Sequence, residues 1–272
     1  MIELCPELRK YFKGAGAFDE ILDLDGKVYR LHKNRKTLRI ERNGRGYFVK
    51  IHRRIGWGEV LKNIFSLKWP VLSARNEYRA IKKLETLCID TMKISGFGEM
   101  GIPPFWLESF IITEELENTV SLEDFCRDWK KNPPDFLLKT ALIRKVAGIA
   151  RTLHQNGVNH RDFYICHFLI DRSKPPSPPL NLYLIDLHRV QVRRSTPERW
   201  IIKDLAGLFF SSMDTGLTSR DLFRFMEVYT GKPIRSVLKD ELCFWQLVNT
   251  RAGSLYTKEF KRPPDALQVK GG

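Results

Sequence analysis

The sequence predicts an α+β protein with two lobes, of which the first is rich in strands and the second rich in helices. Three observations support this prediction. Short segments of β-branched and aromatic residues, separated by turn residues, fill the first part. Apolar residues at helical spacing dominate from residue 135 onward. A chain of 272 residues is also long enough for two cores. We place the boundary so that the lobes comprise residues 1–115 and 116–272.

The first lobe begins with strands. The segments "KVYRLHK" (27–33), "TLRIER" (37–42) and "YFVKIHR" (47–53) have strand composition, and the turn signals "KNRK" and "NGRG" separate them. The pair Asn43-Gly44 favours a tight hairpin, because both residue types tolerate positive φ. These segments predict an antiparallel sheet.

Helices and a further strand follow. Residues 58–69 have a helical pattern that ends at Pro70, and residues 73–87 predict a stronger helix that starts at a serine. The segment "SFIITEEL" (109–116) is typical of a buried strand that runs into an acidic turn. The sequence thus predicts two helices and a buried strand after the first three strands.

The second lobe is mostly helical. Residues 135–157 predict a long helix with a glycine at its end. A short apolar strand is predicted within residues 182–189, after a segment rich in proline and serine. Helices are predicted at 203–213 and 219–229.

Composition excludes several classes of protein. No apolar run approaches the roughly 20 residues needed to cross a bilayer, and the N-terminus lacks the layout of a signal peptide. The five cysteines are scattered and form no CxxC pair, which argues against a disulfide framework or a zinc site. These features predict a cytoplasmic protein. Its net charge of +14, from 46 basic and 32 acidic residues, implies an acidic partner.

Four charged residues match the needs of phosphoryl transfer, which requires positioning and charge neutralisation rather than covalent chemistry. Lys50 ends a strand, and Glu77 lies in the helix that follows. Asp162 lies in the loop after the long helix, within "VNHRDFYICHFLI", and Asp186 follows a short strand. A lysine held by a glutamate can bind the phosphates of ATP. One aspartate can orient an acceptor hydroxyl, and the other can hold Mg²⁺, which prefers oxygen ligands.

The order of these residues resembles the bilobal protein-kinase-like fold. The segments "RDFYICHFL", "LIDLHRVQVR", "KDLAGLFFSSMDTGLTSRD", "FIITEEL" and "NPPD" further resemble the lipopolysaccharide core heptose(I) kinases of Gram-negative bacteria, over residues 18–229. This resemblance implies ATP-dependent phosphorylation of an inner-core heptose, at the cytoplasmic face of the inner membrane. It also implies that Asp162 is the catalytic aspartate, that Asp186 binds metal, and that Lys50 and Glu77 form the phosphate clamp.

Other roles follow from the same resemblance. Backbone groups of Glu114 and Leu116 are expected to hold the adenine. The chain has no glycine-rich phosphate loop, since its first hairpin turn is "KNRK". We therefore expect Lys33, Arg35 or Lys36 to contact nucleotide or substrate phosphate.

The chain departs from protein kinases at one metal-site position. His167 replaces an asparagine, and imidazole is a poorer Mg²⁺ ligand than an amide oxygen. His167 remains a candidate for the metal site beside Asp186, with a purely structural hydrogen bond as the alternative. His160 is expected to be structural. Asp204 either anchors the catalytic loop or caps its helix.

The basic surface suggests partners. Residues 30–54 hold ten basic residues and one acidic residue, and residues 60–72 mix aromatic residues with lysines. The acceptor is expected to be lipopolysaccharide core, and an anionic membrane surface fits this composition. Packing of residues 60–72 on the sheet is the alternative. An acidic protein such as an acyl carrier protein is a further possible partner.

Other functions remain open. Within the same chemistry, the acceptor could be 3-deoxy-manno-octulosonate or a small molecule. A non-catalytic kinase-like scaffold is a second class, against which the four charged residues argue. A nucleic-acid-binding module would use the aromatic residues of the basic hairpin, but it leaves the aspartates unexplained. We therefore expect no nucleic-acid partner.

Overall fold

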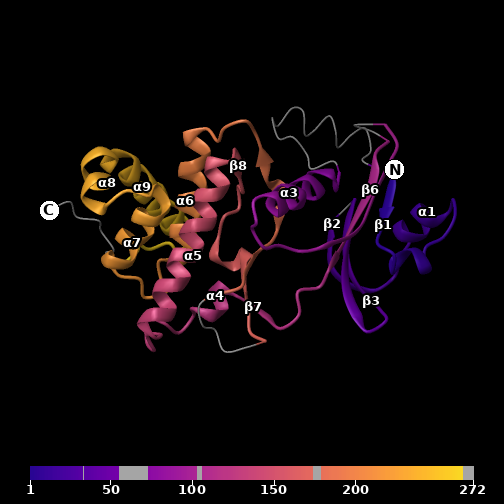
Figure 1. Cartoon of the computed structure of the whole chain (residues 1–272), viewed down its shortest axis with the longest axis horizontal. Helices are drawn as coiled ribbons and strands as arrows, with labels where there is room; N and C mark the ends of the chain where they lie inside the picture. The colour runs from indigo at the N-terminus through magenta and orange to yellow at the C-terminus, as the bar shows by residue number, and fades with distance from the viewer. Residues whose placement is uncertain (33, 55–72, 103–105, 174–178, 266–272) are drawn as a thin grey trace. The chain divides into compact units, whose positions relative to one another are not determined.

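The predicted strands and helices of the sequence fold into two compact units in the computed structural model (Figure 1). The structure describes residues 1–32, 34–54, 73–102, 106–173 and 179–265. Unit 1 comprises Met1–Thr86, Thr91–Leu116 and Leu187–Arg189. Unit 2 comprises Leu87–Asp90, Glu117–Asp186 and Val190–Gly272. Unit 1 holds the large sheet and unit 2 holds most of the helices, so the predicted α+β class is confirmed.

The described part of unit 1 contains a six-stranded antiparallel sheet (Figure 1). In the order of the sheet, its strands are β1 (Ile2–Leu4), β5 (Ile94–Met100), β6 (Glu108–Glu114), β4 (Arg45–His52), β3 (Arg35–Arg42) and β2 (Lys27–His32). The predicted hairpin turn joins β3 to β4, with Asn43 at φ 52° and Gly44 at φ 71°. Two consecutive residues at positive φ give the twist that adjacent antiparallel strands require.

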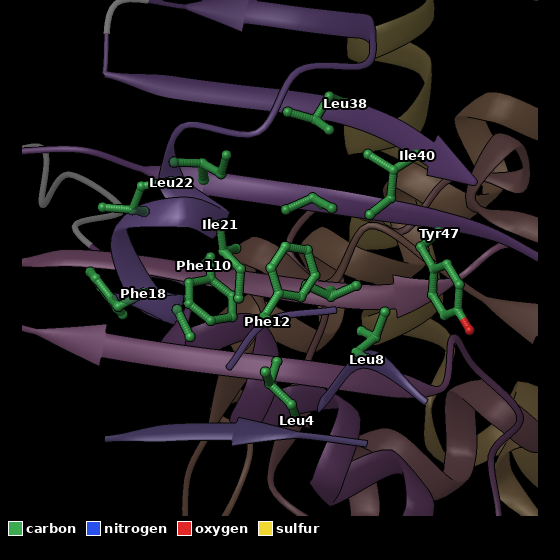
Figure 2. Packing of buried hydrophobic residues seen from close by; sticks show 14 residues of the cluster. Leu4, Leu8, Phe12, Phe18, Ile21, Leu22, Leu38, Ile40, Tyr47 and Phe110 are labelled. Atoms are coloured by element: carbon green, nitrogen blue, oxygen red, sulfur yellow. The ribbon is translucent and has the colours of Figure 1, made fainter. Parts of the chain in front are cut away.

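One face of this sheet carries an apolar core (Figure 2). Alternate residues of β4, among them Tyr47 and Val49, point to this face, as does Phe110 of β6. Helix α1 (Ala17–Leu22) covers it, and the rings of Phe18 and Phe110 lie 5.5 Å apart between centroids. Because strand side chains alternate, Lys50 points to the opposite face.

Helix α3 (Arg75–Thr86) belongs to the opposite side of the sheet, where it contacts β5 and β6. Its apolar face buries Ala80, Ile81 and Leu84, as the helical spacing of the sequence predicted. The hydroxyl of Ser73 accepts a hydrogen bond from the backbone N–H of Arg75 at 3.0 Å. The serine start of this helix is therefore confirmed.

Unit 2 contains most of the described helices. They are α4 (Leu122–Phe125), α5 (Phe136–Gln155), α6 (Glu198–Ser212), α7 (Ser219–Thr230), α8 (Ile234–Asp240) and α9 (Leu242–Phe260). Asp135 caps α5 by accepting hydrogen bonds from the N–H groups of Leu137 and Leu138. Helix α5 packs against α7, and α6 packs against α9 (Figure 1). No helix of the described residues is long and apolar enough to cross a membrane.

Short strands lie between these helices and flank the loops that carry the predicted site residues. They are β7 (Thr119–Ser121), β8 (Val158–Asn159), β9 (Phe168–Asp171), β10 (Leu182–Leu184) and β11 (Gln191–Val192). Strand β9 pairs with β7 and β10, and β8 pairs with β11. Between β8 and β9 lies the predicted catalytic loop, which ends in the short 3₁₀ helix η2 (Ile165–His167). This pairing fixes both ends of the loop within unit 2.

Several elements differ from the expectation or lie outside the described residues. The first hairpin turn is shorter than "KNRK", because β3 already begins at Arg35. Helices α8 and α9 were not predicted. The apolar residues of α9 surround most of its circumference rather than one stripe, so its periodicity is weak. Lys33 and the predicted helix at 58–69 lie outside the described residues.

We expect Gly157→Ala to destabilise the protein by about 2–3 kcal/mol, because a residue with Cβ is strained in its conformation. Gly157 ends α5 with φ +75°, and a Cβ there would lie 1.9 Å from the carbonyl oxygen of Arg193. Gly14 has the same φ but open space around it, so Gly14→Ala is the matched control. Urea unfolding measures both variants. Equal losses for the two would show that the contact with Arg193 has no effect.

Candidate active site

Lys50 and Glu77 form a close ion pair within unit 1. Strand β4 supplies the lysine, and the first turn of α3 supplies the glutamate, where a negative charge suits the helix dipole. The Nζ atom of Lys50 lies 2.6 Å from Oε1 of Glu77. The glutamate side chain is only 2% exposed, and that of the lysine is 25% exposed. Such a buried carboxylate is tolerable only with a cation beside it.

Both members of the pair keep polar atoms that can bind a ligand. The ammonium group of Lys50 has three N–H donors, and within the described residues only Glu77 accepts from it. Oε2 of Glu77 is buried and has no hydrogen-bond partner in the same part of the chain. The lysine is thus fixed in direction by one contact and keeps two donors for an anionic ligand.

His52 lies two residues after Lys50, on the same face of β4. Burial, together with the nearby charges of Arg35, Lys50 and His188, lowers the pKa of His52 to about 3. The imidazole is therefore neutral at physiological pH. It adds no positive charge to this face, which Lys50 and Arg35 already make positive.

The basic residues of the first hairpin point in different directions. Arg35 lies opposite His52 in the β3–β4 register and so shares the face of Lys50. The Nζ atom of Lys36 donates to the carbonyl oxygen of Leu24 at 2.8 Å, on the other face of β3. Among the described residues, Arg35 is therefore the better-placed candidate of this hairpin for a phosphate contact.

The end of β6 places Glu114 and Leu116, the two predicted adenine contacts. The carboxylate of Glu114 lies 3.0 Å from Nζ of Lys93, and its N–H donates to the Lys93 carbonyl. The Glu114 side chain is thus engaged by Lys93. The neighbouring Glu115 carboxylate pairs with Nε of Arg39 at 2.8 Å and lies close to Gly46.

Asp204 anchors the predicted catalytic loop within unit 2. It lies inside α6 and is 1% exposed. Its carboxylate accepts hydrogen bonds from the backbone N–H groups of His160 at 2.6 Å and Arg161 at 2.8 Å. Arg161 adopts φ 75°, a strained conformation that this anchor holds. Of the two roles expected for Asp204, the structure supports the anchor, since the helix begins at Glu198.

His160 is a structural residue, as expected. Its ring is buried, which lowers its pKa, and the neutral Nε2–H donates to the carbonyl oxygen of Ile185 at 3.0 Å. The ring stacks on that of His167 with centroids 5.9 Å apart. His160 therefore joins the loop to the segment that carries Asp186.

His167 connects the two predicted site aspartates. Its Nδ1 lies 2.7 Å from the carbonyl oxygen of Asp162, so Nδ1 carries a proton and donates. Its Nε2 then faces Oδ2 of Asp186 at 3.4 Å. Asp186 itself adopts φ 58°, which is uncommon for a residue with a side chain. The structure brings the predicted residues Asp162, His167 and Asp186 together.

This arrangement has donor atoms that suit a cation. A histidine whose Nδ1–H donates to a backbone carbonyl presents its bare Nε2, which is the usual arrangement of a metal ligand. Within the described residues, no group of three or more histidine, cysteine or acidic residues could hold a metal ion. One or two protein ligands are nevertheless enough for Mg²⁺ when substrate phosphates supply the others.

The sequence did not predict an apolar cavity of about 120 Å³ inside unit 2. Side chains of α4, α5, α6, α7, α9 and the segment after α4 line it, among them Leu122, Cys126, Trp129, Leu142, Val146, Leu205, Leu208, Phe225, Met226, Trp245 and Val248. Burial raises the pKa of Cys126 to about 12, so its thiol is inert. A cavity in such a core removes packing contacts and destabilises the fold unless a ligand fills it.

The chain is similar to known proteins of one family. Residues 19–229 match the model of the lipopolysaccharide kinase (Kdo/WaaP) family. A lipopolysaccharide core heptose(I) kinase WaaP from Pseudomonas aeruginosa is 48% identical over 252 residues, which cover 92% of this chain and 94% of the relative. A protein of the same description from Escherichia coli K12 is 47% identical over 253 residues, which cover 93% and 96%.

A solved structure described as WaaP in complex with acyl carrier protein has the same fold. Its TM-score is 0.82 at 43% sequence identity, and the match covers 94% of this chain and 99% of that one. The kinase-like α+β fold expected from the sequence is therefore confirmed. Because the family model covers most of the chain and relatives match nearly all of it, the chain belongs to the lipopolysaccharide kinase (Kdo/WaaP) family.

Proposed function

We propose that this protein transfers the γ-phosphate of ATP to a heptose hydroxyl of the lipopolysaccharide inner core. The observation that carries this proposal is the 48% identity to a heptose(I) kinase over 92% of the chain. The Lys50–Glu77 pair and the Asp162–His167–Asp186 arrangement give the chemistry a basis in this chain's own residues.

Residues of unit 1 are proposed to bind the nucleotide. The two remaining donors of Lys50 bind α- and β-phosphate oxygens, while Glu77 holds the ammonium in direction. Arg35, on the same face, makes a second contact with phosphate. Lys33 is the alternative residue for this contact. Backbone groups of Glu114 and Leu116 hold the adenine, since the Glu114 carboxylate is engaged by Lys93.

Residues of unit 2 are proposed to act on the acceptor and the metal. Asp162 orients the acceptor hydroxyl and receives its proton as the phosphate is transferred. Asp186 and Nε2 of His167 hold Mg²⁺, for which the phosphates supply further oxygen ligands. When bound, the ion neutralises charge that develops on the phosphate oxygens. The hydrogen bond from Nδ1 of His167 to the Asp162 carbonyl fixes the position of the His167 ring relative to the loop that carries Asp162.

Phosphate transfer from γ-labelled ATP to defined acceptors tests this function directly. The acceptors are lipopolysaccharide that lacks core phosphate, a truncated form that ends at 3-deoxy-manno-octulosonate, and a small-molecule panel. Label in the heptose region supports the proposal. Label only in the truncated form would identify the octulosonate as the acceptor, an alternative that the family description includes. Nucleotide binding without any transfer would favour a scaffold.

The place of action is proposed to be the cytoplasmic face of the inner membrane, because the acceptor carries a lipid. The net charge of +14 suits an anionic surface. The segment 60–72, which suggested membrane contact, lies outside the described residues. Sedimentation of the protein with anionic vesicles, compared with neutral ones, measures this association.

We also propose that an acylated acyl carrier protein binds this chain, with its acyl chain in the apolar cavity. A related structure is described as a complex with acyl carrier protein. The cavity in unit 2 is lined almost wholly by aliphatic and aromatic side chains, which suits a hydrocarbon chain and no charged ligand. An acidic partner also complements the basic character of the chain.

A cavity-filling variant tests this partner. Val146, on α5, lines the cavity, and Val146→Phe places a ring in the space. Acylated carrier protein is expected to raise the melting temperature of the wild type but not that of the variant. Carrier protein without an acyl chain is the ligand control and should have little effect on either. Equal stabilisation of wild type and variant would exclude the cavity as the acyl site.

A further inference from the structure

A histidine of α5 is buried on the apolar face of its helix. His154 lies in the last turn of α5, and its side chain is only 2% exposed. The buried residues Val146, Ala150 and Leu153 lie on the same side of the helix. Burying a polar ring among such neighbours is unfavourable unless its nitrogens have partners. The surroundings of the two ring nitrogens therefore decide what His154 does.

Tyr229 of α7 holds the first nitrogen. Its hydroxyl oxygen lies 2.9 Å from Nδ1 of His154. Burial raises the pKa of Tyr229, so the hydroxyl keeps its proton at physiological pH. The Tyr229 ring is fixed by aromatic neighbours, since it stacks on Phe225 with centroids 6.0 Å apart and meets Trp245 edge to face at 5.7 Å. Tyr229 thus gives the His154 ring a fixed orientation.

The second nitrogen, Nε2, faces the carboxylate of Asp204. Nε2 lies 3.5 Å from Oδ2 of Asp204, which is longer than a normal hydrogen bond, so the contact is electrostatic. Nε2 is buried and makes no hydrogen bond within the described residues. A ring with a bare Nε2 would direct a lone pair at the carboxylate, which is unfavourable. A neutral ring that accepts from Tyr229, or a protonated ring, directs Nε2–H at the carboxylate and stabilises its charge.

His154 reaches the predicted catalytic loop on both sides of Asp162. Asp204 accepts hydrogen bonds from two backbone N–H groups directly before Asp162 in the chain. Phe163, directly after Asp162, is 1% exposed, and its ring centroid lies 6.2 Å from that of His154. The same imidazole therefore contacts the anchor of the loop and the buried side chain that follows the aspartate.

We propose that His154 is a positioning residue for phosphate transfer. Its Nε2–H fixes the direction of the Asp204 carboxylate, and its ring supports Phe163, so that Asp162 is held where it orients the acceptor hydroxyl. This proposal rests on the proposed function and adds a residue that does not touch the reacting atoms. The sequence did not indicate this role, because a histidine in the last turn of a helix is also typical of a contact with the helix dipole.

Two amide variants test the role of Nε2–H. The side-chain N–H of glutamine extends about as far as Nε2 of histidine, whereas that of asparagine extends only as far as Nδ1. His154→Gln therefore keeps a donor toward Asp204, and His154→Asn loses it. We expect His154→Asn to lower kcat about 10- to 100-fold with nearly unchanged KM values, and His154→Gln to stay within about threefold of the wild type. Initial rates per folded molecule measure these parameters.

Two further variants separate positioning from packing. Val237→Ala removes buried apolar surface from α8 in the same unit and should lower the urea midpoint but not kcat. Tyr229→Phe keeps the ring and removes only the hydroxyl that orients His154, so kcat should fall about threefold to tenfold. If His154→Asn does not fold, Tyr229→Phe carries the test, and a wild-type kcat for it overturns the proposal.

The amide pair also gives results that contradict the proposal. A wild-type kcat for His154→Asn would show that His154 has no part in positioning Asp162. Equal losses of kcat in His154→Asn and His154→Gln would show that the shape of the imidazole, and not its Nε2–H, supports the loop. Either result overturns the proposal.

Amide hydrogen exchange separates this proposal from the proposed function, because it needs no substrate. The backbone amides of residues 160–163 should exchange faster in His154→Asn than in the wild type and His154→Gln. If they do but the wild type transfers no phosphate to any acceptor, His154 stands as a residue that positions the loop and the kinase assignment fails. If the wild type transfers phosphate and exchange is unchanged in His154→Asn, the kinase assignment stands and the proposal for His154 fails.

Discussion

Asp162→Asn is expected to lower kcat for phosphate transfer by about 10³- to 10⁴-fold, because asparagine cannot accept the proton of the acceptor hydroxyl. The amide has the same shape as the carboxylate, so the hydrogen bond from His167 to the backbone carbonyl of residue 162 is retained. We therefore expect the KM for ATP to change little. Initial rates at saturating acceptor and varied ATP measure both parameters.

The control for this variant is Asp240→Asn, which changes an exposed aspartate at the end of α8 in the same unit. It should leave kcat and both KM values at the wild-type level. A kcat of Asp162→Asn within a few-fold of the wild type would remove Asp162 from the chemical step. A rise in the ATP KM with unchanged kcat would instead move Asp162 to nucleotide binding.

Asp204→Ala is expected to have the largest effect on stability, about 2–5 kcal/mol. The substitution removes the acceptor of two backbone N–H groups, those of His160 and Arg161, and each buried donor without a partner costs about 1–3 kcal/mol. Loss of this anchor also releases Arg161 from its strained conformation, so Asp162 loses its position and kcat falls. Urea unfolding and kcat under folding conditions measure the two effects.

A graded series distinguishes the anchor from a general loss of charge. Asp204→Asn keeps one acceptor oxygen and should retain part of the stability and activity. Asp240→Ala removes an exposed aspartate and should cost little. If Asp204→Ala unfolds at the same urea concentration as Asp240→Ala, the two backbone contacts do not stabilise the loop. If stability falls but kcat per folded molecule is unchanged, the anchor has no part in positioning Asp162.

Much of the fold was predictable, because local physical rules determine where strands and helices form. Alternation and the turn at Asn43-Gly44 predicted the β3–β4 hairpin. Apolar spacing and the glycine at its end predicted α5. The spacing of the charged motifs likewise predicted Lys50, Glu77, Asp162 and Asp186 as site candidates, and the structure pairs the first two at 2.6 Å.

Other features depend on contacts between residues far apart in the chain. The role of Asp204 was open in the sequence, since an aspartate near a helix start is equally typical of a cap. Its bonds to His160 and Arg161, residues separated from it by 44 and 43 positions, decide the question. The hydrogen bond from Lys36 to the Leu24 carbonyl and the ion pair of Glu114 with Lys93 could not be predicted either. No local pattern encodes which partner a long side chain reaches.

The sequence by itself determined the fold class, the order of the charged motifs and the family resemblance, since these follow from periodicity, turn chemistry and residue identity along the chain. Only the tertiary structure decided that His167 faces Asp186 and that side chains of five helices line an apolar cavity. The physical reason is that packing brings together side chains from separate elements. Their proximity depends on the whole core rather than on any one segment.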